Sequence, residues 1–180
     1  MTAGTSGADF TVHIVQGEQR VSRAPNECVA TLLGSCVAAC LTDPTVGVGG
    51  MNHFLLPGDD EAGHRGYAER FGVHAMELLV NALLVQGASR ARLQAKLFGG
   101  ADTLRGLSRV GALNAAFATR FLEREGIRVA SECLGGNRGR KVQFWPASGR
   151  ARRSFMCASD VVAAAPMPKP AAASGVLELF

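Results

Sequence analysis

The sequence lacks any hydrophobic run near the ~20 residues that a membrane-spanning helix requires. Its first nine residues, MTAGTSGAD, contain neither a basic segment nor an apolar core, so they are not typical of a secretory signal. We therefore expect a cytoplasmic protein that does not insert into a membrane.

Aromatic side chains are also scarce, with one Trp and one Tyr, and the net charge of +4 is distributed along the chain. Single-stranded nucleic acids are usually bound by a basic groove with stacking aromatic side chains, so we expect no nucleic-acid partner. A mildly basic face could bind an acidic helix of a partner protein, or it could simply be a solvated surface.

Cysteine is present in an odd number without an export signal, which favours reduced thiols. A zinc site formed by Cys36, Cys40 and His53 is excluded if Cys36 and Cys40 lie on one strand. Four strand residues span roughly 13 Å, too far for two sulfurs that must each lie ~2.3 Å from one ion. The five cysteines are Cys28, Cys36, Cys40, Cys133 and Cys157.

The composition, 47% apolar and 19% charged over 180 residues, indicates one globular domain with a substantial core. We expect a flexible N-terminus at 1–9, a single domain at 10–157 and a disordered Ala/Pro-rich tail at 158–180. Hydrophobic periodicity predicts two long helices, at 67–86 and 114–125, together with several strands, and by itself supports only a mixed class of fold. We expect an α+β fold with a mainly antiparallel β core that the two helices partly cover. The predicted strands are 10–15, 27–33, 36–42, 48–56, 90–98, 127–133, 141–145 and 150–156.

The runs 36–42 and 48–56 flank turn residues centred on Pro44-Thr45, which predicts a β-hairpin. A two-residue turn there would place Cys36 opposite His53, with Cβ atoms roughly 4.5 to 5.5 Å apart. A bulge at the glycines after the turn would shift this pairing, and a slip of one residue would move His53 to the other face.

A thiol beside an imidazole can transfer its proton and become the nucleophilic thiolate, so Cys36 and His53 form a candidate catalytic pair. Gly34 and Ser35, directly before the cysteine, could direct backbone N–H groups at an oxyanion. The alternative is that Cys36 is simply a small buried residue.

Four sequence blocks resemble the CheD family of chemoreceptor glutamine deamidases from bacterial chemotaxis. They occur in the family's order and span most of residues 10–155. The blocks are LGSCVAACLTDP at 33–44, GGMNHFLLP at 49–57, KLFGGA at 96–101 and GGNRGRKV at 135–142.

The resemblance implies that Cys36 is the nucleophile and His53 its acid/base partner, with Gly34, Ser35 and Asn52 in the oxyanion and substrate loop. It also implies a third catalytic residue, a threonine upstream of the cysteine. Some members carry this threonine six residues before the cysteine, where this chain has Ala30, so we assign the role to Thr31, five residues before.

The implied fold is a layered αββ arrangement similar to the catalytic domain of cytotoxic necrotizing factor toxins. A further departure is Gly-Ala-Leu-Asn at 111–114, which lacks the arginine usual in the family but keeps Asn114.

The implied activity is hydrolysis of specific glutamines to glutamates on the cytoplasmic helical domain of methyl-accepting chemotaxis receptors, with no metal or cofactor. A thiol protease or a transglutaminase would use the same Cys/His chemistry. The alternative from another class is a non-catalytic adaptor that binds receptors or the CheC phosphatase, which is also the second partner to consider for the enzyme.

Overall fold

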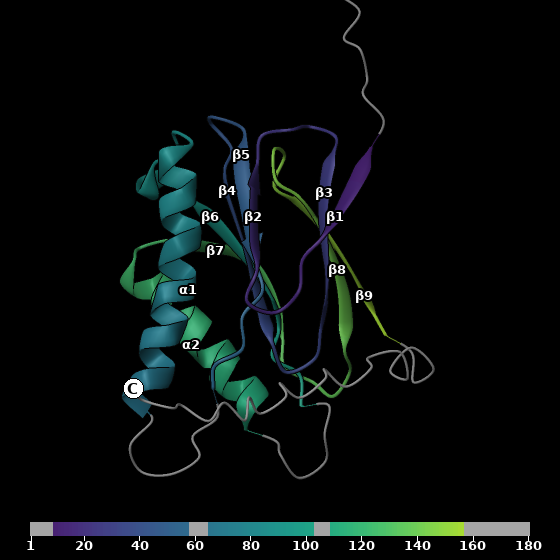
Figure 1. Ribbon diagram of the computed structural model, residues 1–180, viewed down its shortest axis with the longest axis vertical. Helices are drawn as coiled ribbons and strands as arrows, with labels where there is room; N and C mark the ends of the chain where they lie inside the picture. Colours follow the sequence, from purple (N-terminus) through teal and green to yellow (C-terminus); the bar gives the residue numbers. More distant parts are fainter. Residues whose placement is uncertain (1–8, 58–64, 103–108, 157–180) are drawn as a thin grey trace, which may run out of the picture.

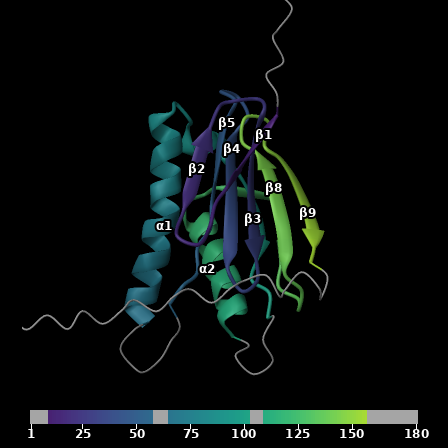
Figure 2. The same ribbon diagram turned by 45° about the vertical axis from the view of Figure 1, so that its right-hand side comes forward.

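The computed structural model describes residues 9–57, 65–102 and 109–156, and it arranges them in three layers (Figure 1). A four-stranded sheet has the order β1-β3-β8-β9, and a five-stranded sheet has the order β2-β5-β4-β6-β7. Both helices lie on one face of the five-stranded sheet, and the four-stranded sheet covers the other face (Figure 2). Two strand pairs, β1–β3 and β6–β7, are parallel and the others are antiparallel. The predicted α+β, αββ architecture is confirmed.

The elements occur along the chain in the following order. The strands are β1 Phe10–His13, β2 Gln19–Ser22, β3 Glu27–Leu33, β4 Val37–Asp43, β5 Val48–Asn52, β6 Gln94–Gly99, β7 Arg128–Leu134, β8 Arg140–Trp145 and β9 Arg150–Phe155. The helices are α1 Arg65–Val85, the 3₁₀ turn η1 Arg90–Arg92 and α2 Val110–Arg124.

The central strand β4 is buried along its whole length because both faces of its sheet are covered. Val37, Ala39 and Leu41 face the core beneath the helices. Ala38 and Cys40 face the core between the two sheets. This alternation fixes which side chains from β4 and its neighbours can meet between the sheets.

The hairpin β4–β5 differs from its predicted register. Its turn contains four residues, 44–47, because Gly47 adopts a φ of 62° and donates its N–H to the Asp43 carbonyl at 3.0 Å. Thr42 therefore pairs with Gly49, and the bridge Val37–Phe54 continues that register. The prediction that Cys36 lies directly opposite His53 is wrong by two residues, and this even shift leaves both residues on the same face.

The sequence pattern also misplaced some secondary elements. Residues 90–92 form η1 instead of the start of a strand, and β2 was not predicted. Helical spacing in the first helix predicts a core-facing stripe made of Phe71, Ala75, Leu78, Leu79, Ala82, Leu83 and Val85. Leu79 and Leu83 are buried as predicted, whereas Phe71, Leu78 and Val85 are exposed. Met76 and Val80, which the stripe did not include, complete the buried face of α1.

In the described residues, no helix has the length and apolar character needed to span a membrane. The predictions of a flexible N-terminus and a disordered tail concern residues outside the described ranges, apart from Asp9, and they stay predictions.

Candidate active site

Cys36 lies in the short loop that connects β3 to β4, and the backbone carbonyls of this loop are all engaged by the protein. The Gly34 carbonyl accepts a hydrogen bond from Ala101 N at 2.9 Å, and the Cys36 carbonyl accepts one from Gly100 N at 2.8 Å. The Ser35 carbonyl accepts one from Asn114 Nδ2 at 3.0 Å. These three bonds fix the loop from the α2 and β6 side.

The close approach of β6 to this loop requires glycine. Gly99 has a φ of 115°, and a Cβ there would lie 2.1 Å from the Cys36 carbonyl oxygen. A Cβ on Gly100 would lie 2.8 Å from the Gly111 carbonyl oxygen. The Gly-Gly pair therefore lets one backbone pass directly against another.

The Cys36 side chain is half-buried and packs against the core between the sheets. Burial raises the pKa of its thiol above the ordinary value, and its own backbone N–H, directed at the sulfur, partly opposes that rise. The sulfur donates a hydrogen bond to the Gln16 side-chain oxygen at 3.7 Å. Burial and the hydrogen bond to Gln16 both favour the protonated thiol over the thiolate.

His53 follows directly after β5 and is buried, with only 6% of its surface exposed. Its Nδ1 lies 2.8 Å from the Thr31 hydroxyl oxygen, and that hydroxyl also donates to the Ile14 carbonyl at 2.8 Å. A hydroxyl has one proton, so the Nδ1–H of His53 must be the donor to Thr31. The neutral imidazole is thereby fixed in the tautomer that leaves Nε2 unprotonated.

Nε2 of His53 is fully buried and has no hydrogen-bond partner within the described part of the chain. Burial lowers the pKa of His53 from 6.5 to about 4. An unprotonated, desolvated nitrogen of this kind is available to accept a proton from a group placed against it.

The β1–β2 turn is attached to the backbone of His53. Gly17 N donates to the His53 carbonyl at 2.8 Å, and His53 N donates to the Glu18 carbonyl at 3.0 Å. Gln16, which contacts the Cys36 sulfur, belongs to this turn. The sequence pattern did not identify Gln16, because nothing in it links this residue to a cysteine twenty residues later.

Asn114 is a second residue to which the sequence pattern gave no role. It is fully buried on α2, where its Oδ1 accepts from Leu56 N at 2.8 Å and its Nδ2 donates to the Ser35 carbonyl at 3.0 Å. One side chain thus joins the cysteine loop to the segment that follows His53.

The structure joins His53 directly to Thr31, and the β1–β2 turn connects the His53 backbone to the Cys36 side chain through Gln16. Among the described residues no hydrogen bond joins the Cys36 sulfur to His53 Nε2, and the Asn52 side chain is engaged elsewhere. Asn52 Oδ1 accepts from Ala39 N at 3.0 Å, and its Nδ2 donates to the Ala75 carbonyl on α1 at 3.1 Å. Side chains alternate along a strand, so Asn52 faces the helices while His53 faces the other sheet. Its predicted place in the substrate loop does not agree with this geometry.

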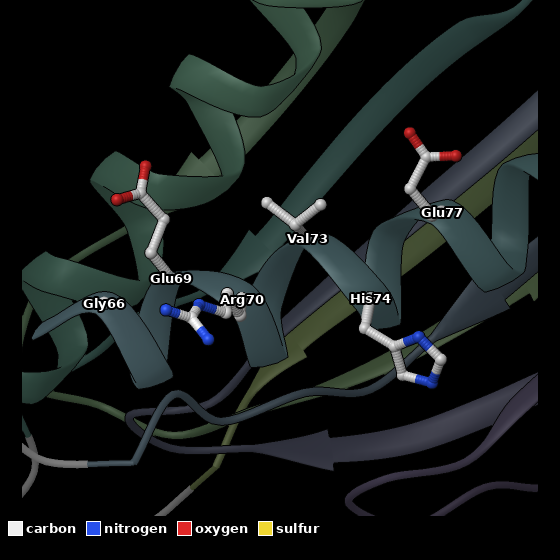
Figure 3. A pocket seen from close by; sticks show the side chains of 6 residues that line it. All are labelled: Gly66, Glu69, Arg70, Val73, His74 and Glu77. Carbon is white, nitrogen blue, oxygen red and sulfur yellow. The ribbon is translucent and has the colours of Figure 1, made fainter. Parts of the chain in front are cut away.

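A separate shallow hollow lies on the outward surface of α1, where Figure 3 shows Glu69, Val73 and Glu77 on one side and Arg70 and His74 on the other. No group of three or more potential metal ligands occurs among the described residues. His64, a reserve acid/base candidate by sequence, lies outside the described ranges.

The fold is a layered αββ arrangement, and near one end of it lie a half-buried thiol and a buried imidazole that is hydrogen-bonded to a hydroxyl. These are the functional groups that a thiol-dependent hydrolase uses. Comparison with known families is specific. Residues 55–154 match the family model described as CheD chemotactic sensory transduction.

Several curated proteins named "probable chemoreceptor glutamine deamidase CheD" are similar over nearly the whole chain. The protein from Caulobacter sp. (strain K31) is 53% identical and covers 99% of this chain and 97% of its own length. The protein from Rhizobium leguminosarum bv. trifolii is 59% identical over 83% of this chain and 82% of its own. The protein from Acidiphilium cryptum is 54% identical over 94% and 93%.

This chain belongs to the CheD family. Among solved structures, a Neisseria meningitidis protein of family DUF152 aligns with a TM-score of 0.39 at 13% identity, covering 66% of this chain and 52% of that one. That likeness is too weak to support an argument.

Proposed function

We propose that this protein hydrolyses the side-chain amide of specific glutamines on chemoreceptors to glutamate, with Cys36 as nucleophile and His53 as acid/base. Family membership and the names of its relatives support the substrate class. The observation that carries the mechanism is the hydrogen-bonded chain from His53 Nδ1 through the Thr31 hydroxyl to the Ile14 carbonyl.

The proposed reaction begins with proton transfer from the Cys36 thiol to His53 Nε2. The thiolate adds to the amide carbon of the substrate, and ammonia leaves with the proton returned by His53. Water, deprotonated at the same nitrogen, then releases glutamate from the thioester. Thr31 has the role of a positioning residue, because it holds the imidazole in the tautomer that makes Nε2 the base.

The oxyanion of each tetrahedral intermediate requires hydrogen-bond donors, and the cysteine loop offers backbone N–H groups. The carbonyls of Gly34, Ser35 and Cys36 accept hydrogen bonds from Asn114 on α2 and from the backbone that follows β6. The Cys36 N–H is directed at its own sulfur. This orientation supports the prediction that the loop amides, rather than a charged side chain, hold the oxyanion.

The substrate is a surface glutamine on a receptor, which we place in its cytoplasmic helical domain, and the protein acts there in the cytoplasm. The half-buried thiol at the rim of the two sheets suits a side chain that projects from a helix. Removal of the amide adds one negative charge to the receptor, which can bias its signalling state. We also propose that the CheC phosphatase is a second binding partner.

The test is the intact mass and peptide map of a receptor cytoplasmic domain after incubation with the parent protein or with Cys36→Ala. We expect Gln-to-Glu conversion with the parent and none with Cys36→Ala. Cys28→Ala is a matched control, since Cys28 is a buried cysteine near the start of β3, the strand whose other end leads into the Cys36 loop, and it should leave the conversion intact.

If the receptor binds and neither protein converts it, the hydrolase mechanism is wrong and the adaptor function is correct. Ammonia release that depends on an added amine would instead identify a transglutaminase.

A further inference from the structure

Gln16 presents to the Cys36 thiol the same functional group that the proposed reaction consumes. Its side-chain oxygen is 3.7 Å from the sulfur, and both groups are accessible from solvent. We propose that Gln16 is an intramolecular substrate of Cys36, so that the protein deamidates its own β1–β2 turn, and that the intact carboxamide occupies the place of the receptor glutamine. This inference rests on the proposed function and adds a self-modification site to it.

The position of Gln16 is set by the fold and not by a freely moving loop. Val15 to Glu18 form a tight turn closed by Glu18 N donating to the Val15 carbonyl at 3.0 Å. Gly17 has a φ of 88°, as the third residue of a type II turn requires. The Glu18 carboxylate also accepts from Val15 N at 2.9 Å, which fastens the turn from its other side.

The same turn makes two hydrogen bonds to the backbone of His53. Gly17 N donates to the His53 carbonyl, and the Glu18 carbonyl accepts from His53 N. The Cα of Gln16 is therefore held at a fixed position relative to His53, the proposed base, and only the side-chain torsions of Gln16 are free. A reacting group on the same chain has a high effective concentration, because no binding step precedes the reaction.

The reaction balances without any further reagent except water. The sulfur of Cys36 bonds to Cδ of Gln16, the Cδ–Nε2 bond of that side chain breaks, and ammonia leaves with the proton that His53 took from the thiol. Water then adds to the thioester, so that a glutamate side chain at position 16 and the free thiol are the products. The net change is carboxamide plus water to carboxylic acid plus ammonia, with no change of oxidation state.

The resting contact is a hydrogen bond to the carboxamide oxygen, so the side chain must rotate before the sulfur can reach the carbon. We therefore expect self-deamidation to be slower than conversion of a bound receptor. The product carboxylate would lie beside the sulfur and oppose its ionisation. Conversion of Gln16 thus reduces the activity of the enzyme that performs it.

The experiment follows the freshly purified full chain over time by intact mass and peptide mapping, comparing the parent with Cys36→Ala. We expect glutamate to accumulate at position 16 in the parent and not in Cys36→Ala, through a thioester species lighter than the chain by one ammonia. Gln19 and Gln143 are internal controls in the same digests, because no hydrogen bond among the described residues joins either of them to a thiol. Both should stay unconverted.

Two outcomes would overturn the self-modification. Gln16 could stay intact in a preparation that converts receptor glutamines, or it could convert equally in the parent and in Cys36→Ala. A preparation that converts neither Gln16 nor the receptor overturns both this inference and the proposed function, and the receptor assay separates that case from the first.

A second measurement tests the occupancy of the substrate position. With Gln16→Ala, the KM for the receptor should fall several-fold because no internal amide competes, whereas Gln19→Ala should leave it unchanged. An unchanged or higher KM for Gln16→Ala would show that the Gln16 carboxamide does not compete with substrate.

Discussion

At the scale of single residues, the proposed chemistry depends on which nitrogen of His53 carries the proton. The Thr31 hydroxyl can donate once, and that proton is used on the Ile14 carbonyl. The sequence left the third residue between two positions, because side chains five and six residues before the cysteine lie on opposite faces of a strand. The bond from Thr31 to His53 could be found only once β3 and β5 were placed in opposing sheets.

Thr31→Val should remove this bond while keeping the shape of the side chain. Without it the imidazole is free to adopt the other tautomer, and we expect kcat/KM for ammonia release to fall on the order of 10- to 100-fold. Thr31→Ser keeps the hydroxyl and should stay within a few-fold of the parent. Equal activity of Thr31→Val and Thr31→Ser would contradict the positioning role.

The pH dependence should reflect a neutral thiol–imidazole pair. Burial lowers the pKa of His53 to about 4, so the base stays unprotonated at pH 5, and it is lost only as the pH falls through about 4. Burial raises the pKa of Cys36 above 9.0, so alkylation of this cysteine should accelerate only in alkaline solution. We expect kcat/KM to stay level from about pH 5 to 9.

Rates of ammonia release and of Cys36 alkylation, both followed against pH, provide the check. If activity falls as the pH rises toward 9 and Cys36 is alkylated rapidly at pH 6, the pair is a preformed thiolate and imidazolium. That result would contradict the neutral pair.

At the scale of elements, the site depends on α2 and β6 as much as on the strands that carry Cys36 and His53. Periodicity predicted the existence of these elements and the limits of β3 correctly. It could not predict that α2 presents a polar residue to two loops, because a buried asparagine has no periodic signal. The missed strand β2 is four residues long and half-exposed, so its apolar alternation is too short to detect.

Asn114→Asp should test the link between the cysteine loop and the segment that follows His53. The carboxylate can still accept from Leu56 N, but it cannot donate to the Ser35 carbonyl, which is left unpaired. We expect a loss of about 1–3 kcal/mol in unfolding free energy and a reduced kcat. Urea titration and ammonia release measure the two effects.

The matched control is Asn81→Asp, which changes an exposed asparagine on α1. It should alter neither the unfolding free energy nor kcat. If Asn114→Asp lowers stability but leaves kcat unchanged, Asn114 supports the fold without positioning the cysteine loop.

Gly99→Ala should displace the cysteine loop, because the added methyl would meet the Cys36 carbonyl oxygen at 2.1 Å and the φ of 115° disfavours any side chain. We expect a loss of about 2 kcal/mol or more in unfolding free energy, together with a loss of activity. Gly126→Ala is the control, since its φ is also positive at 64° but nothing lies within 4 Å of the added atom. Similar losses for both variants would show that the close approach itself is unimportant.

At the scale of the whole molecule, the candidate site is formed where two sheets meet. The β1–β2 turn, the cysteine loop, the end of β5 and the start of α2 are distant in sequence and converge there. The activity should therefore be sensitive to contacts that hold one sheet against the other, even when these contacts are remote from Cys36.

One polar contact between the sheets is an ion pair made by Glu27 on β3. Its carboxylate accepts from Arg20 Nε at 2.7 Å and from the Ser22 hydroxyl at 2.7 Å, and both partners lie on β2 in the other sheet. Glu27 is buried, whereas Arg20 is half-exposed, so solvent weakens the ion pair. We expect Glu27→Gln to lower the unfolding free energy at pH 7 by about 1–2 kcal/mol.

The difference in unfolding free energy between the parent and Glu27→Gln should vanish in acid. The direction of the pKa shift of Glu27 sets the pH range in which it vanishes. Hydrogen bonding from Arg20 holds the pKa of Glu27 below its ordinary 4.5 in the folded state, so its contribution is complete above pH 4.5 and disappears as the pH falls through the folded pKa. Urea titrations of the parent and Glu27→Gln at a series of pH values test this, with the exposed Glu132→Gln as control. A difference between parent and Glu27→Gln that stays constant from pH 7 down to well below pH 4.5 would mean that packing, not the charge, joins the sheets at this point.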